Sequence, residues 1–278
     1  MEEKVWLVTG SSSGFGKEIC KEALEKGDYV IATARKTDTL NDLVEEFGDK
    51  VLALELDVTN QDSINECKEK ALAWKDKIDV LVNNAGIGSV GALEELNKEN
   101  TKKIFDVNVF GVIEVTRAFL PKFREQKSGT IVNISSVVGH ATMPGFGAYA
   151  ASKHAVEGIS ESLAGEIKHL GIKVLIVEPG AFRTSFVGHN MVESEKIEDY
   201  NPALEQTRGM MANFNQIAKG DPNKAAKVII EVVNKNDDTL RLPLGNDSID
   251  WITQSLNGRL EQISKNEELT RSTDVDTE

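Results

Sequence analysis

Cysteine and long apolar runs are what this chain of 278 residues most lacks. Its two cysteines, Cys20 and Cys67, lie in separate helix-like stretches, which excludes a disulfide framework. The four histidines show no metal-ligand spacing either, so we expect reduced thiols, a cytoplasmic protein and no metal site. Because no apolar run is long enough to cross a membrane, we also expect a soluble globular fold.

The chain also has fewer basic than acidic residues. Lysine and arginine number 32 against 45 acidic residues, which gives a formal net charge of −13 and a pI of about 4.9. Such a balance argues against a nucleic acid or an anionic membrane surface as partner. The first ten residues, "MEEKVWLVTG", become strand-like by residue 4, so we expect no signal peptide.

Short β-branched runs alternate along the chain with longer segments of helical period. The expected strands are 4–10, 28–35, 50–58, 78–86, 129–136, 172–180 and a weaker 240–245. The expected helices are 14–26, 39–47, 61–74, 97–125, 149–170 and 222–235. This alternation predicts an α/β fold, a doubly wound parallel sheet of about seven strands with helices on both faces, as one domain over residues 1–278.

Three segments depart from the alternation. Residues 181–220 are irregular and rich in Met and Phe. The apolar stripe within 246–263 is typical of a helix that packs on the body, and the polar residues 266–278 are expected to be a flexible tail. Asp221, followed by Pro222, is a candidate N-cap for the last helix of the alternation.

A glycine-rich turn follows the first strand. Gly10, Gly14 and Gly16 in "TGSSSGFGKEI" end a strand and open a helix, at the start of a strand–helix–strand unit. In an open parallel sheet such a turn lets the backbone approach a pyrophosphate, and the helix N-terminus points free N–H groups at it. An ordinary loop is the alternative, but this context favours dinucleotide binding.

The order of motifs resembles the short-chain dehydrogenase/reductase family, in its single-domain branch with a Rossmann-type fold. The matching motifs are T-G-x-x-x-G-x-G, "LDV" with Asp57, "NNAG" at 83–86 and "VEPG" followed by Thr184, and together they span residues 4–184. The resemblance implies a nicotinamide dinucleotide cofactor. The contacts it implies are Gly10, Ser12, Ser13, Gly14, Phe15, Gly16, Asp57, Val58, Asn84, Ala85, Gly86, Tyr149, Lys153, Pro179, Gly180 and Thr184. In the family the lysine at the position of Lys153 hydrogen-bonds the nicotinamide ribose, and the segment at 181–220 forms a substrate-binding lid.

The end of the second strand predicts which dinucleotide is preferred. An acid about 20 residues beyond the glycines would bind the adenosine ribose and repel a 2′-phosphate. The family's position for this acid falls on Ala34, and Arg35 follows, whose guanidinium can pair with a phosphate. We therefore expect NADP(H) to be preferred, with NAD(H) possible; a solvated basic loop at Arg35 and Lys36 is the alternative.

Tyr149 and Lys153 fall one turn apart if their segment is helical, in a chain with only three tyrosines. A free phenol has a pKa of about 10. A nearby ammonium group and an oxidised nicotinamide both favour the phenolate and lower that pKa. The pattern therefore predicts Tyr149 as the proton donor and acceptor and Lys153 as its electrostatic partner, although an accidental pair on a surface helix would look the same.

Two further residues complete a tetrad in the resemblance. Ser136 lies 13 residues before Tyr149 at the end of a strand, and its hydroxyl could hold a substrate oxygen as charge develops. Its neighbour Ser135 is the less favoured choice, because in the family the second serine is the active one. Asn108 lies within a predicted helix and in the family binds a water that links the lysine to solvent. The alternatives are a polar strand end and a solvent-facing asparagine.

The expected function is that of an NADP(H)-preferring oxidoreductase that interconverts a carbonyl and an alcohol. Motifs resembling 17β-hydroxysteroid and retinol dehydrogenases imply a small apolar ketone, aldehyde or alcohol, and the family implies a homodimer or homotetramer. Candidate pocket residues are His140, Met143, Phe146, Phe182, Phe186 and Met191, with Met210, Met211 and Phe214 as a further apolar wall; ordinary packing is the alternative for each. Two other functions remain open, a silent NADP(H)-sensing module and a sugar-nucleotide epimerase or dehydratase of the same fold.

Overall fold

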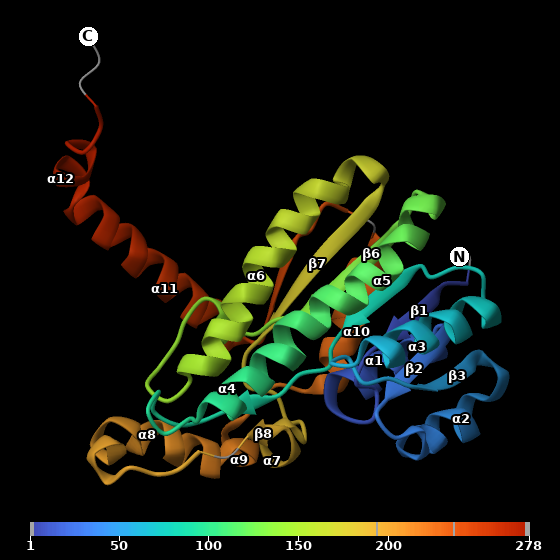
Figure 1. Cartoon of the computed structure of the whole chain (residues 1–278), viewed down its shortest axis with the longest axis horizontal. Helices are drawn as coiled ribbons and strands as arrows, with labels where there is room; N and C mark the ends of the chain where they lie inside the picture. The colour runs from blue at the N-terminus through green and yellow to red at the C-terminus, as the bar shows by residue number, and fades with distance from the viewer. Residues whose placement is uncertain (1–2, 193, 236, 276–278) are drawn as a thin grey trace.

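A seven-stranded parallel sheet forms the centre of the molecule in the computed structural model, which describes residues 3–192, 194–235 and 237–275 (Figure 1). The strand order is β3-β2-β1-β4-β6-β7-β9, and every pairing is parallel. The strands are β1 (Val5–Val8), β2 (Tyr29–Ala34), β3 (Val51–Glu55), β4 (Val80–Asn83), β6 (Gly129–Ile134), β7 (Ile172–Pro179) and β9 (Arg241–Leu244). The doubly wound parallel sheet expected from the sequence is confirmed.

Helices cover both faces of the sheet, so each strand is buried on two sides. In β1, Trp6 and Val8 belong to one core cluster, while Val5 and Leu7 belong to the other. The first cluster includes side chains of α1 (Gly14–Glu25), α2 (Asn41–Phe47) and α10 (Pro222–Lys235). The second includes side chains of α3 (Gln61–Trp74), α5 (Gly111–Gln126) and α6 (Gly147–Ile167). This explains why the strands are apolar throughout rather than alternating.

Short elements connect the main ones. They are η1 (Thr37–Leu40), η2 (Gly48–Lys50), η4 (Val137–Gly139), η5 (Lys168–Leu170) and η6 (Glu198–Tyr200). The Asp221 side chain accepts from the backbone N–H of Asn223 at 2.9 Å, so the expected cap of α10 is confirmed. Both cysteines are free and buried, and burial raises the pKa of each thiol to about 12.

The helix expected over 97–125 is interrupted. It consists of α4 (Lys98–Phe105), a π-helical turn η3 (Asp106–Phe110) and α5. A π-turn accommodates one extra residue in a helix and is found mostly at functional sites. Here it contains Asn108, whose side chain is directed into the protein and is 1% exposed.

The segment 181–220 is more regular than expected. It contains α7 (Phe186–His189), β8 (Met191–Val192), α8 (Asn201–Ala212) and α9 (Phe214–Ile217). The short strand β8 pairs in parallel with β5 (Gly88–Ser89) outside the main sheet. These elements lie together at one end of the molecule in Figure 1, below α4 and α6.

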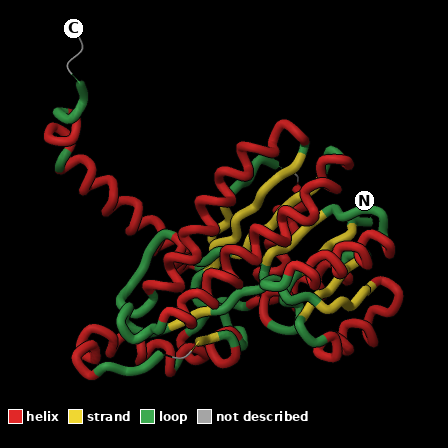
Figure 2. Tube along the Cα trace, viewed as in Figure 1, coloured by secondary structure: helices red, strands yellow, loops and turns green. Residues whose placement is uncertain are grey.

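The C-terminal helices extend away from the body, as Figure 2 shows. They are α11 (Asn246–Lys265) and α12 (Glu267–Arg271). Of the apolar stripe expected to pack, only Ile252 is buried, whereas Leu260 and Ile263 are 60% and 66% exposed. The expectation that this stripe packs within the chain is wrong, because α11 leaves the body soon after it begins. Of the tail expected over residues 266–278, the last three residues lie outside the part of the chain that the structure describes.

Among the described helices, none combines the length and apolar character that spanning a bilayer requires. Strands β1 and β4 lie side by side in the sheet. The chain continues from β1 to β2 and β3 on one side and from β4 to β6, β7 and β9 on the other, so the strand order reverses between β1 and β4. In such folds the crevice beyond the carboxyl ends of the strands at this reversal is where ligands bind.

Candidate active site

A cavity of about 770 Å³ opens at this reversal. The segments after β1, β2, β3, β4, β6 and β7 line it, together with α6 and the segment 182–190. It is therefore built from the carboxyl ends of six strands. Cavities of this size hold cofactor-sized ligands.

The glycine turn forms one wall of the cavity. Gly10 and Gly14 have φ values of +68° and +57°, which side chains rarely adopt, and a Cβ on Gly16 would overlap the carbonyl oxygen of Gly10. The Asn84 side chain donates to the carbonyl oxygens of Thr9 and Gly10 at 2.8 and 3.0 Å. These constraints hold the turn close to the "NNAG" segment and leave its backbone open toward the cavity.

Arg35 and Asp57 lie along the same cavity, after β2 and β3. The Asp57 carboxylate accepts hydrogen bonds from the backbone and hydroxyl of Thr59, at 2.9 and 2.7 Å, so its orientation is fixed. Arg35 is exposed, and none of the described residues forms an ion pair or hydrogen bond with its guanidinium. Ala34 also lines the cavity, so no carboxylate competes at the position where an NAD-preferring site carries one.

Tyr149, Lys153 and Ser136 line the inner part of the cavity. Tyr149 and Lys153 lie one turn apart on α6, and the ammonium nitrogen is 5.9 Å from the centre of the phenol ring. The Lys153 ammonium donates to the carbonyl oxygen of Ile134 at 2.8 Å. Ser136 follows β6, and its Oγ accepts from the backbone N–H of Val138 at 3.3 Å.

Burial shifts the pKa values of both Tyr149 and Lys153. Burial raises the pKa of Tyr149 to about 12, and a hydrogen bond with the Ser136 hydroxyl opposes this only in part. Burial lowers the pKa of Lys153 to about 8, against the opposing charge of Glu157. In the protein without cofactor the pKa of Tyr149 is therefore raised, because desolvation of the phenolate is the larger effect. The lowered pKa expected from the sequence depends on an oxidised nicotinamide as well as on the lysine, and it stays a prediction. A bound oxidised nicotinamide would add positive charge and act in the other direction.

The π-turn brings Asn108 next to this group. Its Oδ1 accepts from the backbone N–H of Ile87 at 2.9 Å, and its Nδ2 donates to the carbonyl oxygen of Ile87 and to Ser152 Oγ, at 2.8 and 2.9 Å. The Ser152 hydroxyl in turn donates to the carbonyl oxygen of Tyr149 at 2.7 Å. Asn108 thus joins the loop after β4 to the helix that carries Tyr149, and is not a solvent-facing residue.

The segment after β7 closes the cavity opposite the glycine turn. Pro179, Gly180 and Thr184 line it, and a Cβ on Gly14 would lie 3.5 Å from the Thr184 side chain. At Gly180 a Cβ would overlap the carboxylate of Asp247, which accepts from the backbone N–H of Ala181 at 2.6 Å. The structure thus brings the two expected cofactor-contacting segments against each other.

The six expected pocket residues separate into two groups. Phe182 and Phe186 line the cavity, and the Phe186 ring lies 5.9 Å from that of Tyr149. Met191 is next to Phe186, since a Cβ on Gly88 would meet both side chains. The other three are not among the residues that line the cavity. Met143 and Phe146 belong to a small apolar cluster that packs against Tyr149, with the Phe146 ring 6.4 Å from the phenol ring, and His140 belongs to an ion cluster. Of the further apolar wall, Phe214 lines the cavity and Met210 and Met211 join that apolar cluster.

Several cavity residues were not predicted from the sequence, among them Thr39, Lys103, Asp106 and Asn190. None lies in a motif or at the end of an expected strand, so no local pattern distinguishes them from solvated loop and helix residues.

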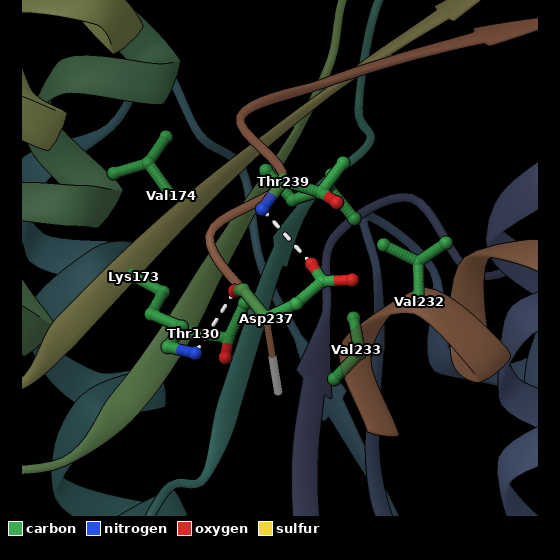
Figure 3. Close-up of a pocket in the computed structure, with 8 residues that line it drawn as sticks. Thr130, Lys173, Val174, Val232, Val233, Asp237 and Thr239 are labelled. Atoms are coloured by element: carbon green, nitrogen blue, oxygen red, sulfur yellow. Dashed lines mark hydrogen bonds between the residues drawn. The ribbon is translucent and has the colours of Figure 1, made fainter. Parts of the chain in front are cut away.

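A second hollow, at the opposite end of β6 and β7, has a volume of only about 10 Å³ (Figure 3). Thr130, Val174 and Val233 are among its walls, and Lys173 donates to the carbonyl oxygen of Asp237 at 2.9 Å across it. That volume holds about one water molecule, so this hollow is no substrate site.

The residues around the large cavity fit a nicotinamide dinucleotide. The glycine turn and the N-terminus of α1 suit the pyrophosphate, the Arg35 guanidinium is free to bind a phosphate, and Lys153 and Tyr149 lie at the inner end.

Comparisons with known proteins agree with this geometry. Residues 4–195 match the family described as short chain dehydrogenase. A 3-ketodihydrosphingosine reductase of Bacteroides thetaiotaomicron is 36% identical, over 88% of this chain and 89% of its own. The crystal structure of a short-chain dehydrogenase from Streptomyces avermitilis superposes with a TM-score of 0.93 at 44% identity, over 99% of this chain and 100% of its own.

A more distant solved structure contains a cofactor. The alcohol dehydrogenase of Thermococcus sibiricus, complexed with 5-hydroxy-NADP, is 26% identical with a TM-score of 0.73, over 87% of this chain and 96% of its own. These similarities, together with the parallel sheet and the glycine turn, support use of a nicotinamide cofactor. The chain belongs to the short-chain dehydrogenase/reductase family and is an NAD(P)-dependent oxidoreductase.

Proposed function

We propose that this protein is an NADP(H)-preferring oxidoreductase that interconverts an apolar carbonyl compound and its alcohol, with Tyr149 as general acid and base. The observation that carries the proposal is the shared cavity. Tyr149, Lys153 and Ser136 line the same cavity as the glycine turn and Arg35, so one bound dinucleotide could reach all of them.

The mechanism follows from the groups at the inner end. A bound reduced nicotinamide would supply hydride to the carbonyl carbon. Ser136 donates a hydrogen bond to the carbonyl oxygen, and Tyr149 transfers its phenolic proton to that oxygen as negative charge develops. Lys153 holds positive charge beside the phenol, which stabilises the phenolate that remains. Alcohol oxidation uses the same groups in reverse.

The proposed preference for NADP(H) rests on Arg35 and Ala34. The Arg35 guanidinium has no partner among the described residues, and Ala34 offers no carboxylate beside it. A 2′-phosphate on the adenosine ribose would give Arg35 a charge-assisted, bidentate partner. The diol of NAD(H) would instead find no acceptor at residue 34.

The apolar substrate is proposed from the aromatic side chains near Tyr149. Phe186 faces the phenol ring, and Phe182 and Phe214 line the same cavity. The segment 181–220 would act as a lid that brings these rings over the substrate. The name of the Bacteroides relative, 3-ketodihydrosphingosine reductase, is consistent with a ketone as substrate.

We also propose a homodimer or homotetramer. Phe110 on the π-turn is 53% exposed, and the stripe on α11 includes Leu260 and Ile263, which are 60% and 66% exposed. Exposed apolar side chains such as those along α11 are typical of protein interfaces. Size-exclusion chromatography with light scattering would test the assembly against the monomer mass of 30.4 kDa.

The test of the proposed reaction is a screen of apolar ketones and aldehydes, followed through the absorbance of NADPH. We expect turnover of at least one compound, and a kcat/KM at least about tenfold higher with NADPH than with NADH, which corresponds to about 1.4 kcal/mol. Tight NADPH binding without turnover of any compound would instead indicate a sensing module. Equal or better use of NADH would overturn the proposed preference.

A further inference from the structure

A buried group of charged side chains lies behind the catalytic residues. His140 Nε2 lies 3.0 Å from Glu178 Oε1 and 3.4 Å from Glu157 Oε2. Arg241 Nε lies 3.5 Å from Glu178 Oε1 and 3.6 Å from Glu157 Oε2. We call His140, Glu157, Glu178 and Arg241 the charge network. Glu157 and Glu178 are 6% and 1% exposed, so their charges require compensation within the protein.

Three members of the network have the spacing of a metal site, since ligand atoms of His140, Glu157 and Glu178 lie within 4.8 Å of one another. The Arg241 guanidinium, however, already lies against both carboxylates. With His140 protonated, two positive and two negative charges balance. A divalent cation would have to displace Arg241, so the arrangement favours an ion network over a metal site.

His140 is charged in this setting. Hydrogen bonds with Glu157 and Glu178 raise the pKa of His140 to about 9, against the opposing effect of burial. Burial alone would raise the pKa of Glu157, but hydrogen bonds from His140 and Ser135 and the charges of His140 and Arg241 outweigh it and hold that pKa below its usual value. Both groups are therefore ionised near neutral pH.

Three of the four members of the network are close in sequence to a part of the active site. Glu157 lies one turn after Lys153 on α6, on the same side of the helix. His140 follows Ser136 and η4, and Glu178 comes directly before Pro179. Glu157 also lies under the turn after β6, because a Cβ on Gly139 would lie 3.1 Å from Glu157 Cγ.

Glu157 is the member of the network that also acts on Lys153. Its carboxylate is buried, 3.4 Å from His140 Nε2 and 3.6 Å from Arg241 Nε, and it lies one helical turn from Lys153. The negative charge of Glu157 favours the charged form of the Lys153 ammonium, because solvent screens a buried charge only weakly. The Lys153 ammonium itself is 6% exposed and donates to the carbonyl oxygen of Ile134.

We propose that Glu157 is a positioning residue for the proposed reaction, which keeps the buried Lys153 ammonium charged, and that the remainder of the charge network holds Glu157 ionised. This inference rests on the proposed function in that Lys153 is taken to bind the cofactor. Glu157 touches neither substrate nor cofactor and acts through Lys153. Without it, the ammonium would lose its proton at a lower pH, and the cofactor would lose a hydrogen-bond donor.

Other polar and charged groups around the network are Tyr149, His154 and Glu161 on α6, Arg259 on α11, and Ser135 after β6. Glu161 binds Arg241 at 3.1 Å, and Arg259 donates to the carbonyl oxygen of His140 at 2.5 Å. Arg259 also lies 3.4 Å from His154 Nε2. None of these contacts replaces Glu157 as the carboxylate nearest to Lys153 along α6.

The test is the pH dependence of NADPH binding, measured by fluorescence without substrate, and of kcat/KM. In the wild type we expect affinity to fall as Lys153 deprotonates, near its pKa of about 8. In Glu157→Gln that midpoint moves down by about one pH unit, because a charge that favoured the ammonium is gone. Glu166→Gln, a change of the same kind at an exposed position on α6, is the control and leaves the midpoint in place.

A second variant keeps the proposal testable even if Glu157→Gln does not fold. Arg241→Gln removes a positive charge from the network, so the midpoint moves up in pH, the opposite direction. A uniform loss of affinity or activity in either variant, with the midpoint unmoved, would show a structural role only and overturn the proposal. Because the binding measurement needs no turnover, failure of every carbonyl substrate would refute the proposed reaction and leave this test intact.

Discussion

Arg35 is the residue through which we expect cofactor choice to act. It is exposed at the cavity rim, without a partner among the described residues, and Ala34 beside it carries no charge. Replacing Arg35 by Ala should raise the KM for NADPH about tenfold, since a charge-assisted bidentate contact of about 1.5 kcal/mol or more is lost. The KM for NADH should hardly change.

Lys36→Ala is the matched control for Arg35, because Lys36 is an exposed cation next in sequence that does not line the cavity. A similar change in NADPH affinity from both variants would show a general effect of positive charge on this loop. Equal effects of Arg35→Ala on NADPH and NADH would contradict recognition of the 2′-phosphate.

His140 gives the protein a stability that depends on pH. Because the pKa of His140 is raised from 6.5 to about 9 in the folded protein, its contribution is fully present below pH 6.5 and is lost as the pH rises through 9. We predict that the melting temperatures of the wild type and His140→Gln converge over this range. Thermal unfolding at a series of pH values measures the difference, and a gap independent of pH would contradict the ion network.

Among the elements, the π-turn sets the position of Asn108. Asn108→Ala would leave the N–H and C=O of Ile87 and the hydroxyl of Ser152 without their partner, in a buried site. We predict a loss of about 2–4 kcal/mol in the free energy of unfolding, because each orphaned buried group costs about 1–3 kcal/mol. Urea unfolding measures it.

Asn65→Ala on α3 is the comparison, because Asn65 is an exposed helical asparagine whose loss should cost less than about 0.5 kcal/mol. If the two variants lost equal stability, Asn108 would not be joining the loop after β4 to α6.

Glu95, a buried carboxylate, makes some of the contacts that hold the segment 194–212, beside the hydroxyls of Ser194 and Thr207. Glu95 Oε1 accepts from the backbone N–H of Ile197 at 2.8 Å and from Arg208 Nη2 at 2.5 Å, while Oε2 accepts from the N–H of Ala92 at 2.7 Å. Arg208→Gln removes the cation that compensates this carboxylate. We predict faster hydrogen exchange over α8 and a higher KM for substrate, with kcat changed less.

Glu205→Gln, an exposed change on the same helix, should leave both the exchange rate and the KM as they are. Unchanged exchange in α8 of Arg208→Gln would mean that the Glu95–Arg208 pair does not hold this segment in place.

Local sequence order was enough to predict much of the site, and non-local packing explains the rest. Tyr149 and Lys153 are one helical turn apart, and Gly10 and Ser136 follow strands whose ends must meet in a parallel sheet, so their meeting could be predicted. His140 could not be placed in this way, because its partners Glu157 and Glu178 come from other elements.

The same reasoning applies to whole elements. The uniformly apolar strands predicted the sheet, because burial on both faces leaves no alternation. The π-turn within 97–125 was not predictable, since one inserted residue does not alter the apolar pattern enough to be seen. The apolar stripe on α11 has the same sequence pattern whether the helix packs on its own chain or remains exposed. Here it remains largely exposed.

At the scale of the whole molecule, the expected cofactor contacts and the proposed catalytic residues Ser136, Tyr149 and Lys153 line the same cavity. Six strand ends, α6 and the segment after β7 surround it. The exposed residues of the α11 stripe do not line this cavity, and the helix leads away from the body in Figure 1. We therefore expect cofactor binding and the proposed assembly through α11 to be separable.

The most direct test of the central claim is kcat for Tyr149→Phe with NADPH and a carbonyl that the wild type reduces. This change keeps the ring packed against Phe186 and removes only the proton. We predict that the Kd for NADPH stays within about twofold while kcat falls about 10²–10⁴-fold, the usual contribution of a general acid. A variant that binds NADPH normally and retains most of the wild-type kcat would show that Tyr149 is not the proton donor.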